Sequence, residues 1–226
     1  MPESIDIVFA LFPRVTQLDF TGPFEVLWRV PGARLTLASR QGGALSTDGG
    51  LCVSELTRLA DVPRADVLCV PGGTGVTDAL RDAEYLQHVR RLGAGARYLT
   101  SVCSGSLILA GAGLLEGKRA ACHWAWRALL AEQGVRVDEA RIVRDGHVLS
   151  GGGVTAGIDF GLALAAELAG EDAACAIQLA IEYAPAPPLS SGRPETAPPA
   201  ILSAARERAE QQYPERRAAL LAARGR

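Results

Sequence analysis

Cys103 has the setting that most clearly predicts chemistry. It stands in a run of small residues, Ser101-Val-Cys-Ser-Gly105, between an apolar segment of strand character and a second apolar segment with a helical pattern. A strand that turns sharply into a helix holds the turn residue above the sheet edge, and the glycine two positions later lets the chain pass close to the strand. The positive end of a helix dipole lowers the pKa of a thiol placed there. We therefore predict that Cys103 is a nucleophile with a lowered pKa.

The other cysteines differ in setting. Cys52 and Cys69 lie in strand-like apolar runs, Cys175 lies in a helical pattern, and Cys122 precedes His123. Five cysteines without regular spacing form neither a disulfide framework nor a zinc site. We expect a reduced, cytoplasmic protein without a bound metal.

Asp19 is a second candidate. It follows the apolar run Ile5–Phe12, which predicts a buried central strand, and Thr21 and Pro23 predict that a helix begins just beyond it. Asp19 would then lie in a loop at the carboxyl edge of the sheet, where open α/β sheets bind ligands. On local sequence alone it is either a capping aspartate or part of a site.

Two glycine-rich junctions are expected at the same edge. Gly73 and Thr74 follow the predicted strand Ala65–Val70, and Val154 follows three glycines before the predicted helix Ala156–Ala169. Bare backbone N–H groups there suit an oxyanion or a small dipole, unless the glycines only make sharp turns. The G-x-G-x-x-G fingerprint and the Walker lysine are both missing, so phosphate binding is not predicted.

His123 lies twenty residues after Cys103. It is either a base or orienting group for the thiol, or a histidine packed beside Trp124 and Trp126. His147 flanks the Asp145-Gly146 turn of a predicted hairpin, and we expect no role for it.

Strands and helices alternate in a pattern that predicts an α/β protein, with a doubly wound, mostly parallel sheet sandwiched by helices. The expected strands are Ile5–Phe12, Arg34–Ala38, a short edge strand Leu51–Ser54, Ala65–Val70, the run before Cys103 and the hairpin Arg141–Ser150; the expected helices include Glu84–Ala96, Ala156–Ala169 and Asp172–Tyr183.

A domain of residues 1–183 followed by an appendage of residues 184–226 is expected. Residues 184–199 hold six of the 13 prolines, which predicts an extended arm. Residues 200–226 form an Ala/Arg/Glu helix with six arginines against three glutamates, a net charge of +3. We interpret it as a charged surface helix or one that clasps an oligomer.

The composition and net charge limit the classes of binding partner that are expected. The 226 residues are 48% hydrophobic and carry a net charge of −2, which gives no reason to expect nucleic acid or an acidic membrane as a partner. The first residues lack the basic and apolar regions of a leader, and no apolar run reaches the ~18 residues of a membrane span. A small-molecule substrate is expected.

Together these motifs resemble those of the DJ-1/PfpI superfamily. They are Leu18-Asp-Phe-Thr-Gly-Pro23, Pro71-Gly-Gly-Thr-Gly75, Ser101-Val-Cys-Ser-Gly105, His123-Trp124 and Gly151-Gly-Gly-Val-Thr-Ala-Gly-Ile-Asp159. The resemblance implies a flavodoxin-like fold, a homodimer, and neither metal nor organic cofactor. It also implies that Cys103 is the nucleophile and Asp19 the acid/base group facing it. Ser104 stands where threonine would be expected from related hydratases.

Within the superfamily the resemblance is greatest to enzymes that hydrate isocyanides, and it implies a cofactor-free carbon–oxygen lyase. The thiolate of Cys103 would attack the isocyanide carbon to give a covalent thioimidate, which water converts to an N-substituted formamide. Asp19 would supply the proton and then activate water. Ser104 and the N–H groups near Gly73 would stabilise developing charge, with Thr74, His123 and Val154 lining the site.

Other functions remain open from the sequence. A glyoxalase-like enzyme would use Cys103 on an α-oxoaldehyde, with His123 as a mobile base. A redox sensor would oxidise Cys103 without turnover. A triad amidotransferase needs a late His-x-Glu, which His147 does not provide, and the residues after 199 are too few for a helix-turn-helix regulator.

Overall fold

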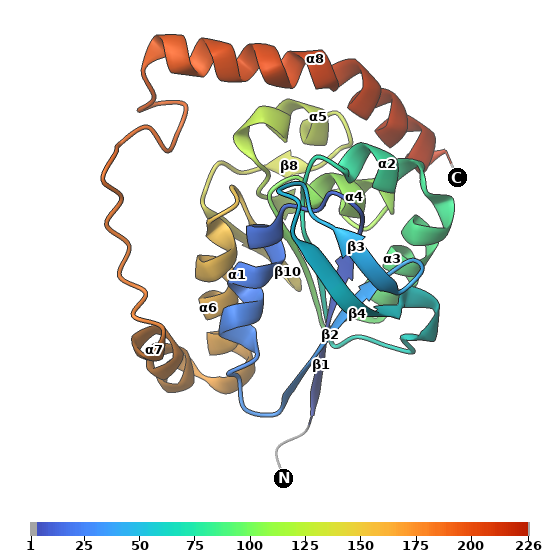
Figure 1. Cartoon of the computed structure of the whole chain (residues 1–226), viewed down its shortest axis with the longest axis vertical. Helices are drawn as coiled ribbons and strands as arrows, with labels where there is room; N and C mark the ends of the chain where they lie inside the picture. Colours follow the sequence, from blue (N-terminus) through green and yellow to red (C-terminus); the bar gives the residue numbers. More distant parts are fainter. Residues whose placement is uncertain (1–3, 226) are drawn as a thin grey trace.

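A central sheet organises the structure, a computed structural model that describes residues 4–225. Residues 1–3 and 226, at the ends of the two expected units, lie outside the described residues. The strands of the sheet are β1 (Ile5–Leu11), β2 (Ala33–Ser39), β3 (Gly43–Ser46), β4 (Cys52–Arg58), β5 (Val67–Val70), β6 (Tyr98–Val102), β9 (Ile142–Asp145) and β10 (Val148–Gly151). They form one eight-stranded sheet in the order β3-β4-β2-β1-β5-β6-β10-β9 (Figure 1).

The strand β1 lies at the centre of this sheet because its side chains are apolar on both faces. It pairs in parallel with β2 and with β5, and its residues from Ile7 to Leu11 are buried. Strands β4, β6 and β10 also join the sheet in parallel, whereas β3 and β9 pair antiparallel at the two edges. The predicted mostly parallel, doubly wound sheet is confirmed.

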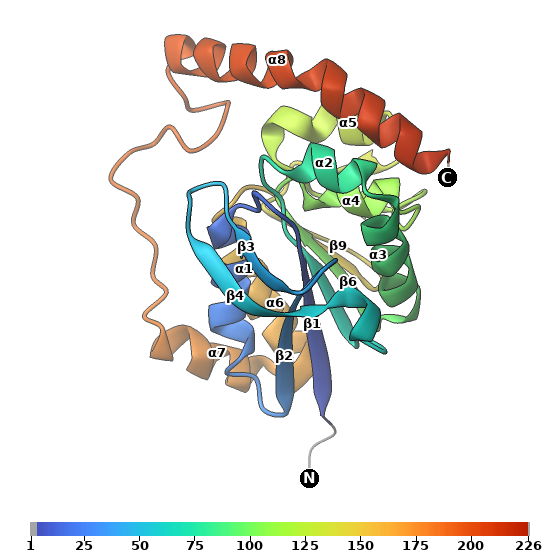
Figure 2. The same cartoon turned by 45° about the vertical axis from the view of Figure 1, so that its right-hand side comes forward.

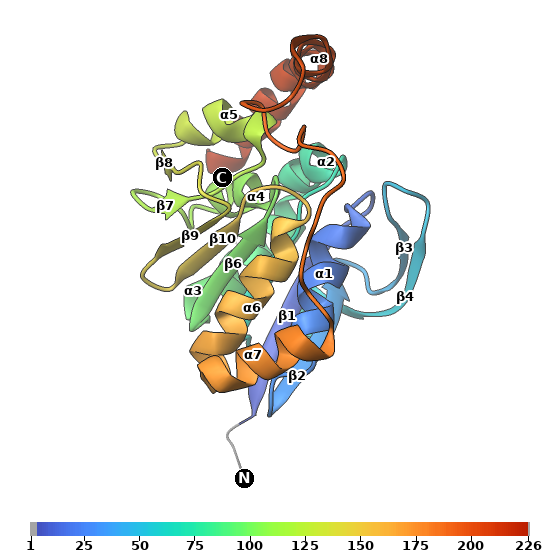
Figure 3. The same cartoon turned by 90° about the vertical axis from the view of Figure 1, so that its left-hand side faces the viewer.

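Helices cover both faces of the sheet. Helices α1 (Gln17–Leu27) and α6 (Ala156–Ala169) pack against each other on one face, with α7 (Glu171–Ala180) against α6 (Figure 3). Helices α2 (Val76–Arg81), α3 (Ala83–Gly95) and α4 (Gly105–Gly111) lie on the other (Figure 2). The short α5 (Arg127–Ala131) follows a 3-10 turn, and α8 (Pro199–Arg224) lies over α2 and α4.

The first helix begins earlier than its sequence predicts. Thr16 has an extended backbone and precedes α1, so Asp19 lies in the first helical turn and Pro23 lies inside the helix. A proline removes one helical hydrogen bond, but here its ring packs against α6, where a Cβ added to Gly157 would lie 2.8 Å from Pro23 Cδ. Tertiary packing therefore overrides the local signal, and the expectation of Asp19 in a loop is wrong.

The region between β2 and β5 also differs from expectation. The segment expected as a short edge strand is the longer β4, which lies between β2 and β3. The true edge strand is β3, which starts directly after Gly42 and pairs antiparallel with β4. Helix α2 and the two-stranded sheet of β7 (Arg119–Ala120) and β8 (Arg136–Val137) were not predicted, because such short elements carry little periodicity.

The C-terminal segment has two parts. Every residue from Ala184 to Arg193 is exposed, and this arm runs outside the helical layers from α7 to α8 (Figures 1 and 3). Helix α8 then packs on the same chain, with Arg216, Ala219, Leu220 and Ala223 buried. The division between residues 183 and 184 stays a prediction, as does the interpretation of α8 as a charged surface helix or one that clasps an oligomer. One face of α8 is buried against this chain. None of the described helices is long and apolar enough to cross a membrane.

Candidate active site

Cys103 occupies a sharp corner between β6 and α4. Its backbone has a φ of +59°, in the left-handed region that side chains rarely adopt, and its side chain is 7% exposed. Its N–H group donates to the carbonyl oxygen of Gly151 at 3.0 Å, which ties the corner to the end of β10. The corner requires Gly105, because a Cβ added there would lie 2.1 Å from the carbonyl oxygen of Val70. The elbow expected from the sequence is therefore present.

The Asp19 carboxyl group is buried beside this thiol. It is 1% exposed, and its Oδ2 accepts a hydrogen bond from the N–H group of Gly72 at 2.8 Å. Its Oδ1 has no hydrogen-bond partner among the described residues. Burial raises the pKa of Asp19 to about 7, while the Gly72 N–H group and the Cys103 thiol lower it. Asp19 can therefore exchange a proton near neutral pH.

The pKa of Cys103 departs from the sequence prediction. Burial raises it well above its ordinary value, and the charge of Asp19 and the neighbouring Cys122 raise it further. The backbone and the hydroxyl of Ser104 lower it, but burial outweighs them. Helix α4 has only 7 residues, so its dipole does not offset the loss of water around the sulfur. The predicted lowering of the Cys103 pKa is therefore wrong.

Ser104 joins the elbow to the glycine-rich loop after β5. Its Oγ accepts a hydrogen bond from the N–H group of Gly73 at 3.2 Å, so its own O–H group remains free to donate. A Cβ added to Gly72 would lie 2.6 Å from both the amide nitrogen and Oγ of Ser104. The Gly73 N–H group expected as an oxyanion donor is thus already bonded. It acts on the site through the Ser104 hydroxyl, which lies beside the sulfur.

A cavity of about 400 Å³ opens over Cys103. Its lining includes predicted residues from four separate parts of the chain: Gly73, Thr74, Ser104, His123 and Val154. Asp19 is not part of the lining and lies buried behind the thiol. The structure therefore brings the predicted residues together at the carboxyl edge of the sheet.

The cavity wall contributed by α8 was missed by the sequence analysis. Helix α8 supplies Ala205, Arg208, Ala209, Gln212 and Arg216. These residues recur at three- and four-residue intervals, which is the spacing of one helical face. The spacing of these residues can be seen in the sequence. Nothing in the sequence around them indicates that this helical face packs over Cys103, about a hundred positions earlier.

His123 lies at the rim with its imidazole held by the backbone. Its Nδ1 accepts a hydrogen bond from the N–H group of Ala125 at 3.3 Å, and its ring packs 5.5 Å from that of Trp124. Burial lowers its pKa, so the ring is neutral near pH 7. With Nδ1 accepting, Nε2 carries the proton, and His123 is placed to donate a hydrogen bond rather than to remove a proton.

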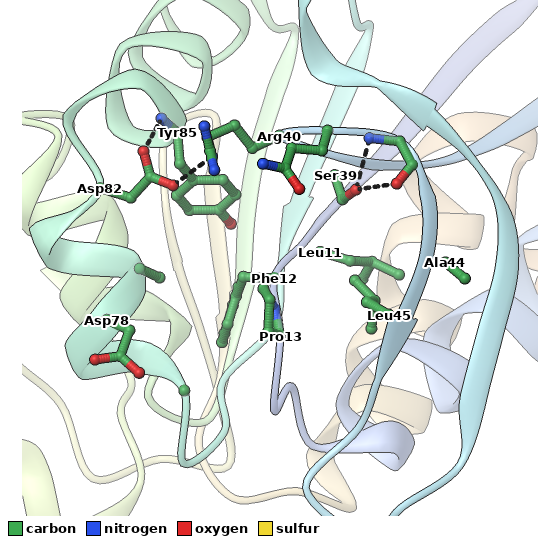
Figure 4. Close-up of a pocket in the computed structure, with 14 residues that line it drawn as sticks. Leu11, Phe12, Pro13, Ser39, Arg40, Ala44, Leu45, Asp78, Asp82 and Tyr85 are labelled. Carbon is green, nitrogen blue, oxygen red and sulfur yellow. Dashed lines mark hydrogen bonds and ion pairs between the residues drawn. The ribbon is translucent and has the colours of Figure 1, made fainter.

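A second cavity, of about 230 Å³, lies between the ends of β1, β2 and β3 and helices α2 and α3 (Figure 4). Several of its polar groups are paired with the protein. Arg40 Nε lies 2.7 Å from Asp82, and the Tyr85 hydroxyl donates to the carbonyl oxygen of Ala10 at 2.8 Å. It contains none of the predicted site residues. Among residues 4–225, no group of three His, Cys, Asp or Glu side chains is arranged to hold a metal ion.

The fold and this site define a doubly wound α/β protein with a buried cysteine on a nucleophile elbow. The chain matches the DJ-1/PfpI family over residues 6–167, and it belongs to that family. An isonitrile hydratase of Pseudomonas putida is 49% identical over 206 residues, which cover 91% of this chain and 90% of that protein. The crystal structure of a THiJ/PfpI family protein from Pseudomonas syringae has a TM-score of 0.93 at 38% identity, covering 96% of this chain and 90% of that chain.

Some of the more distant relatives are longer proteins that match this chain over only part of their length. The HTH-type transcriptional regulator CdhR of Pseudomonas aeruginosa is 30% identical over 74% of this chain, but that match covers 52% of the regulator.

Proposed function

We propose that this protein is an isonitrile hydratase, an enzyme that adds water to an isocyanide (isonitrile) to give an N-substituted formamide. The observation that carries the proposal is the Asp19 carboxyl group buried against the Cys103 thiol beneath a cavity of about 400 Å³. The 49% identity to the Pseudomonas putida isonitrile hydratase supports it over nearly the whole chain.

The first half of the reaction uses the proton that Asp19 and Cys103 share. The sulfur of Cys103 bonds to the terminal carbon of the isocyanide while the S–H bond breaks. The thiol proton passes through the Asp19 carboxylate to the same carbon, giving a thioimidate, R–N=CH–S–Cys. Asp19 can carry this proton because its pKa is raised to about 7.

The second half returns both groups to their starting state. Asp19 takes a proton from water as the water oxygen bonds to the thioimidate carbon, and that proton is delivered to the nitrogen. The C–S bond then breaks as the C=O bond forms, the hydroxyl proton of the adduct passes to the sulfur, and the formamide leaves. The Ser104 hydroxyl lies beside the sulfur and is placed to stabilise charge on it as this bond forms and breaks.

The cavity would hold the organic group of the isocyanide. Trp124, Trp126 and Val154 line it and give it an apolar surface, while His123 is placed to donate a hydrogen bond through Nε2 at the rim. Because α8 completes the wall, we propose that the catalytic unit extends beyond residue 183. No metal or organic cofactor takes part in these steps.

We also propose a cytoplasmic homodimer. Large apolar side chains are exposed on the chain, including Trp28 at 51%, Leu179 at 82% and Leu189 at 77%. Such side chains favour association with a second copy. Light scattering of the purified protein should give a mass near twice 23.7 kDa.

The test of the function is formamide production from an alkyl and an aryl isocyanide. Wild type and Cys175→Ala, which changes an exposed cysteine on α7, should turn over equally. Cys103→Ala should be inactive, and mass spectrometry of wild type quenched during turnover should find the thioimidate on Cys103. Folded wild type without turnover on several isocyanides would refute the proposal.

Two further measurements would then distinguish the alternatives. Activity on α-oxoaldehydes that depends on His123 would indicate a glyoxalase-like enzyme, whereas selective oxidation of Cys103 by peroxide without turnover would indicate a redox sensor.

A further inference from the structure

Arg216 is a buried cation in the wall of the active-site cavity. Its residue is 2% exposed, although it lies on α8, most of whose residues face solvent. Its Nε donates to the Thr77 hydroxyl at 3.3 Å, and its Cζ lies 4.0 Å from the ring centroid of Trp126. These contacts from α2 and from the turn before α5 hold the guanidinium group in one place.

Within residues 4–225, no carboxylate forms an ion pair with this guanidinium group. Among the described residues, none of the ion pairs includes Arg216. Its neighbours differ: Arg217 pairs with Glu132 at 2.6 Å on the surface, and Arg127 pairs with Glu139 at 3.3 Å. Burying a cation without a partner is costly, and arginine does not escape that cost by losing its proton near neutral pH. An anion in the same cavity would offset it.

The anion that can form on the lining of this cavity is the thiolate of Cys103, since the Asp19 carboxyl group is not part of the lining. Arg216 and Cys103 line the same cavity. Burial lowers the pKa of Arg216 to about 10, and the nearby Cys103 and Cys122 oppose this shift. Cys122 lies outside the lining of this cavity and bonds to Ser106, so Cys103 is the sulfur exposed to substrate.

The other charged groups at the site do not perform this role. Asp19, on the α1 side of Cys103, makes ionisation of the thiol harder. His123 is neutral near pH 7, in part because Arg127 and Arg216 both lower its pKa. Glu215 acts on Arg216 only weakly and forms its ion pair with Arg81 at 2.8 Å. Arg208 also lines the cavity, but its side chain is exposed to solvent and its Nε donates to the carbonyl oxygen of Ala204 at 3.1 Å. Arg216 is therefore the buried positive charge that shares the cavity with the sulfur.

We propose that Arg216 is a positioning residue that stabilises the ionised form of Cys103 from across the cavity, so that α8 makes the nucleophile reactive as well as enclosing it. The Thr77 hydroxyl and the Trp126 ring fix the guanidinium for this purpose. The inference concerns the thiol itself and does not depend on which electrophile the enzyme uses.

The test measures the pH dependence of Cys103 alkylation by iodoacetamide. The exposed Cys52 and Cys175 are first replaced by serine, and modification of the Cys103 peptide is followed by mass spectrometry. In Arg216→Met the apparent pKa of the thiol should rise by about one unit, giving alkylation about tenfold slower at pH 8. Arg216→Lys, which keeps the charge, should stay within about threefold of wild type on the same scale.

The matched control is Arg217→Met, which removes the adjacent arginine and its surface ion pair and should leave the alkylation profile unchanged. An unshifted profile in folded Arg216→Met would overturn the proposal, as would an equal shift in Arg216→Met and Arg216→Lys, since packing alone would then explain both.

If Arg216→Met does not fold, Thr77→Val is the second variant. It keeps the positive charge of Arg216 but removes the hydroxyl that accepts its hydrogen bond. It should shift the profile in the same direction by less, and no shift would count against the proposal. Alkylation needs no isocyanide, so this result is separate from failure of the hydratase assignment.

Discussion

Asp19 and Cys103 shift each other's pKa in opposite directions. The thiol lowers the pKa of the Asp19 carboxyl group, whereas the carboxylate raises the pKa of the Cys103 thiol. When the pair holds a single proton, that proton therefore resides mainly on sulfur, and the carboxylate is ready to accept it. Transfer of this proton from the sulfur to Asp19 gives a thiolate beside a neutral carboxylic acid. The total number of protons on the pair does not change.

The first prediction concerns the pH dependence of turnover. Below the pKa of Asp19, about 7, the pair holds two protons, and neither a base nor a thiolate is present. The value of kcat/KM should therefore fall as pH falls through about 7, and approach tenfold loss per unit below it. Initial rates of formamide formation from pH 5 to 9 measure this. A flat profile across that range would contradict the assigned role of Asp19.

The second prediction concerns stability. Asp19 has a folded-state pKa of about 7 against an ordinary value of 3.8, so the folded protein binds its proton more tightly than the unfolded chain. Its contribution is fully present below about pH 4 and is lost as pH rises through about 7. Asp19→Asn removes this loss and should raise the free energy of unfolding at pH 8, by at most about 4 kcal/mol.

Urea denaturation of wild type and Asp19→Asn at pH 5 and pH 8 measures this difference. The gain should shrink toward pH 5, where wild-type Asp19 is protonated in the folded state. A variant that is equally stabilised at both pH values would indicate a cause other than the charge.

The third prediction concerns the elbow. In Gly105→Ala the new Cβ would lie 2.1 Å from the carbonyl oxygen of Val70 and 2.8 Å from that of Pro71, both fixed backbone atoms. We expect destabilisation by about 3 kcal/mol and loss of turnover as the elbow shifts. Gly95→Ala in α3 is the control, since a Cβ there meets nothing within 4 Å, and it should be neutral or slightly stabilising. Thermal denaturation and the isocyanide assay distinguish the two.

The fourth prediction concerns the Ser104 hydroxyl. Ser104→Ala leaves the Gly73 N–H group without its acceptor, which should cost about 1 to 3 kcal/mol, and removes a donor beside the sulfur. We expect kcat to fall more than KM rises. Ser104→Thr keeps the hydroxyl and should retain most of the activity. Steady-state kinetics of both variants measure the change in kcat and KM, and urea denaturation measures the change in the free energy of unfolding. Equal activity in wild type and Ser104→Ala would remove Ser104 from the mechanism.

Features encoded within one strand-to-helix junction were predictable from the sequence. The corner at Cys103 and the turns at Gly73 and Val154 follow apolar strands, and strands in parallel end at one edge. Three features were not predictable. Helix α1 starts at Gln17 because packing of Pro23 on α6 outweighs its local preference.

The other two unpredicted features are the raised pKa of Cys103, which depends on how deeply the thiol is buried, and the contact of Arg216 with Trp126, which joins distant segments of the chain. Burial raises the pKa of Cys103, and burial is not encoded near position 103. Likewise, the contact of Arg216 with Trp126 joins two helices that only the complete fold brings together.

The exposed arm from Ala184 to Arg193 connects α8, which forms part of the cavity wall, to the rest of the chain. Because this arm tethers α8, docking of the helix is an intramolecular association, with an effective concentration on the order of millimolar for a short flexible linker. One proteolytic cut in the arm would make that docking bimolecular. At micromolar protein this lowers the effective concentration of the helix about a thousandfold, which favours its release together with Arg216 and the exposure of Cys103 to water. The continuity of a segment that touches no substrate thus decides whether the enzyme has a closed site.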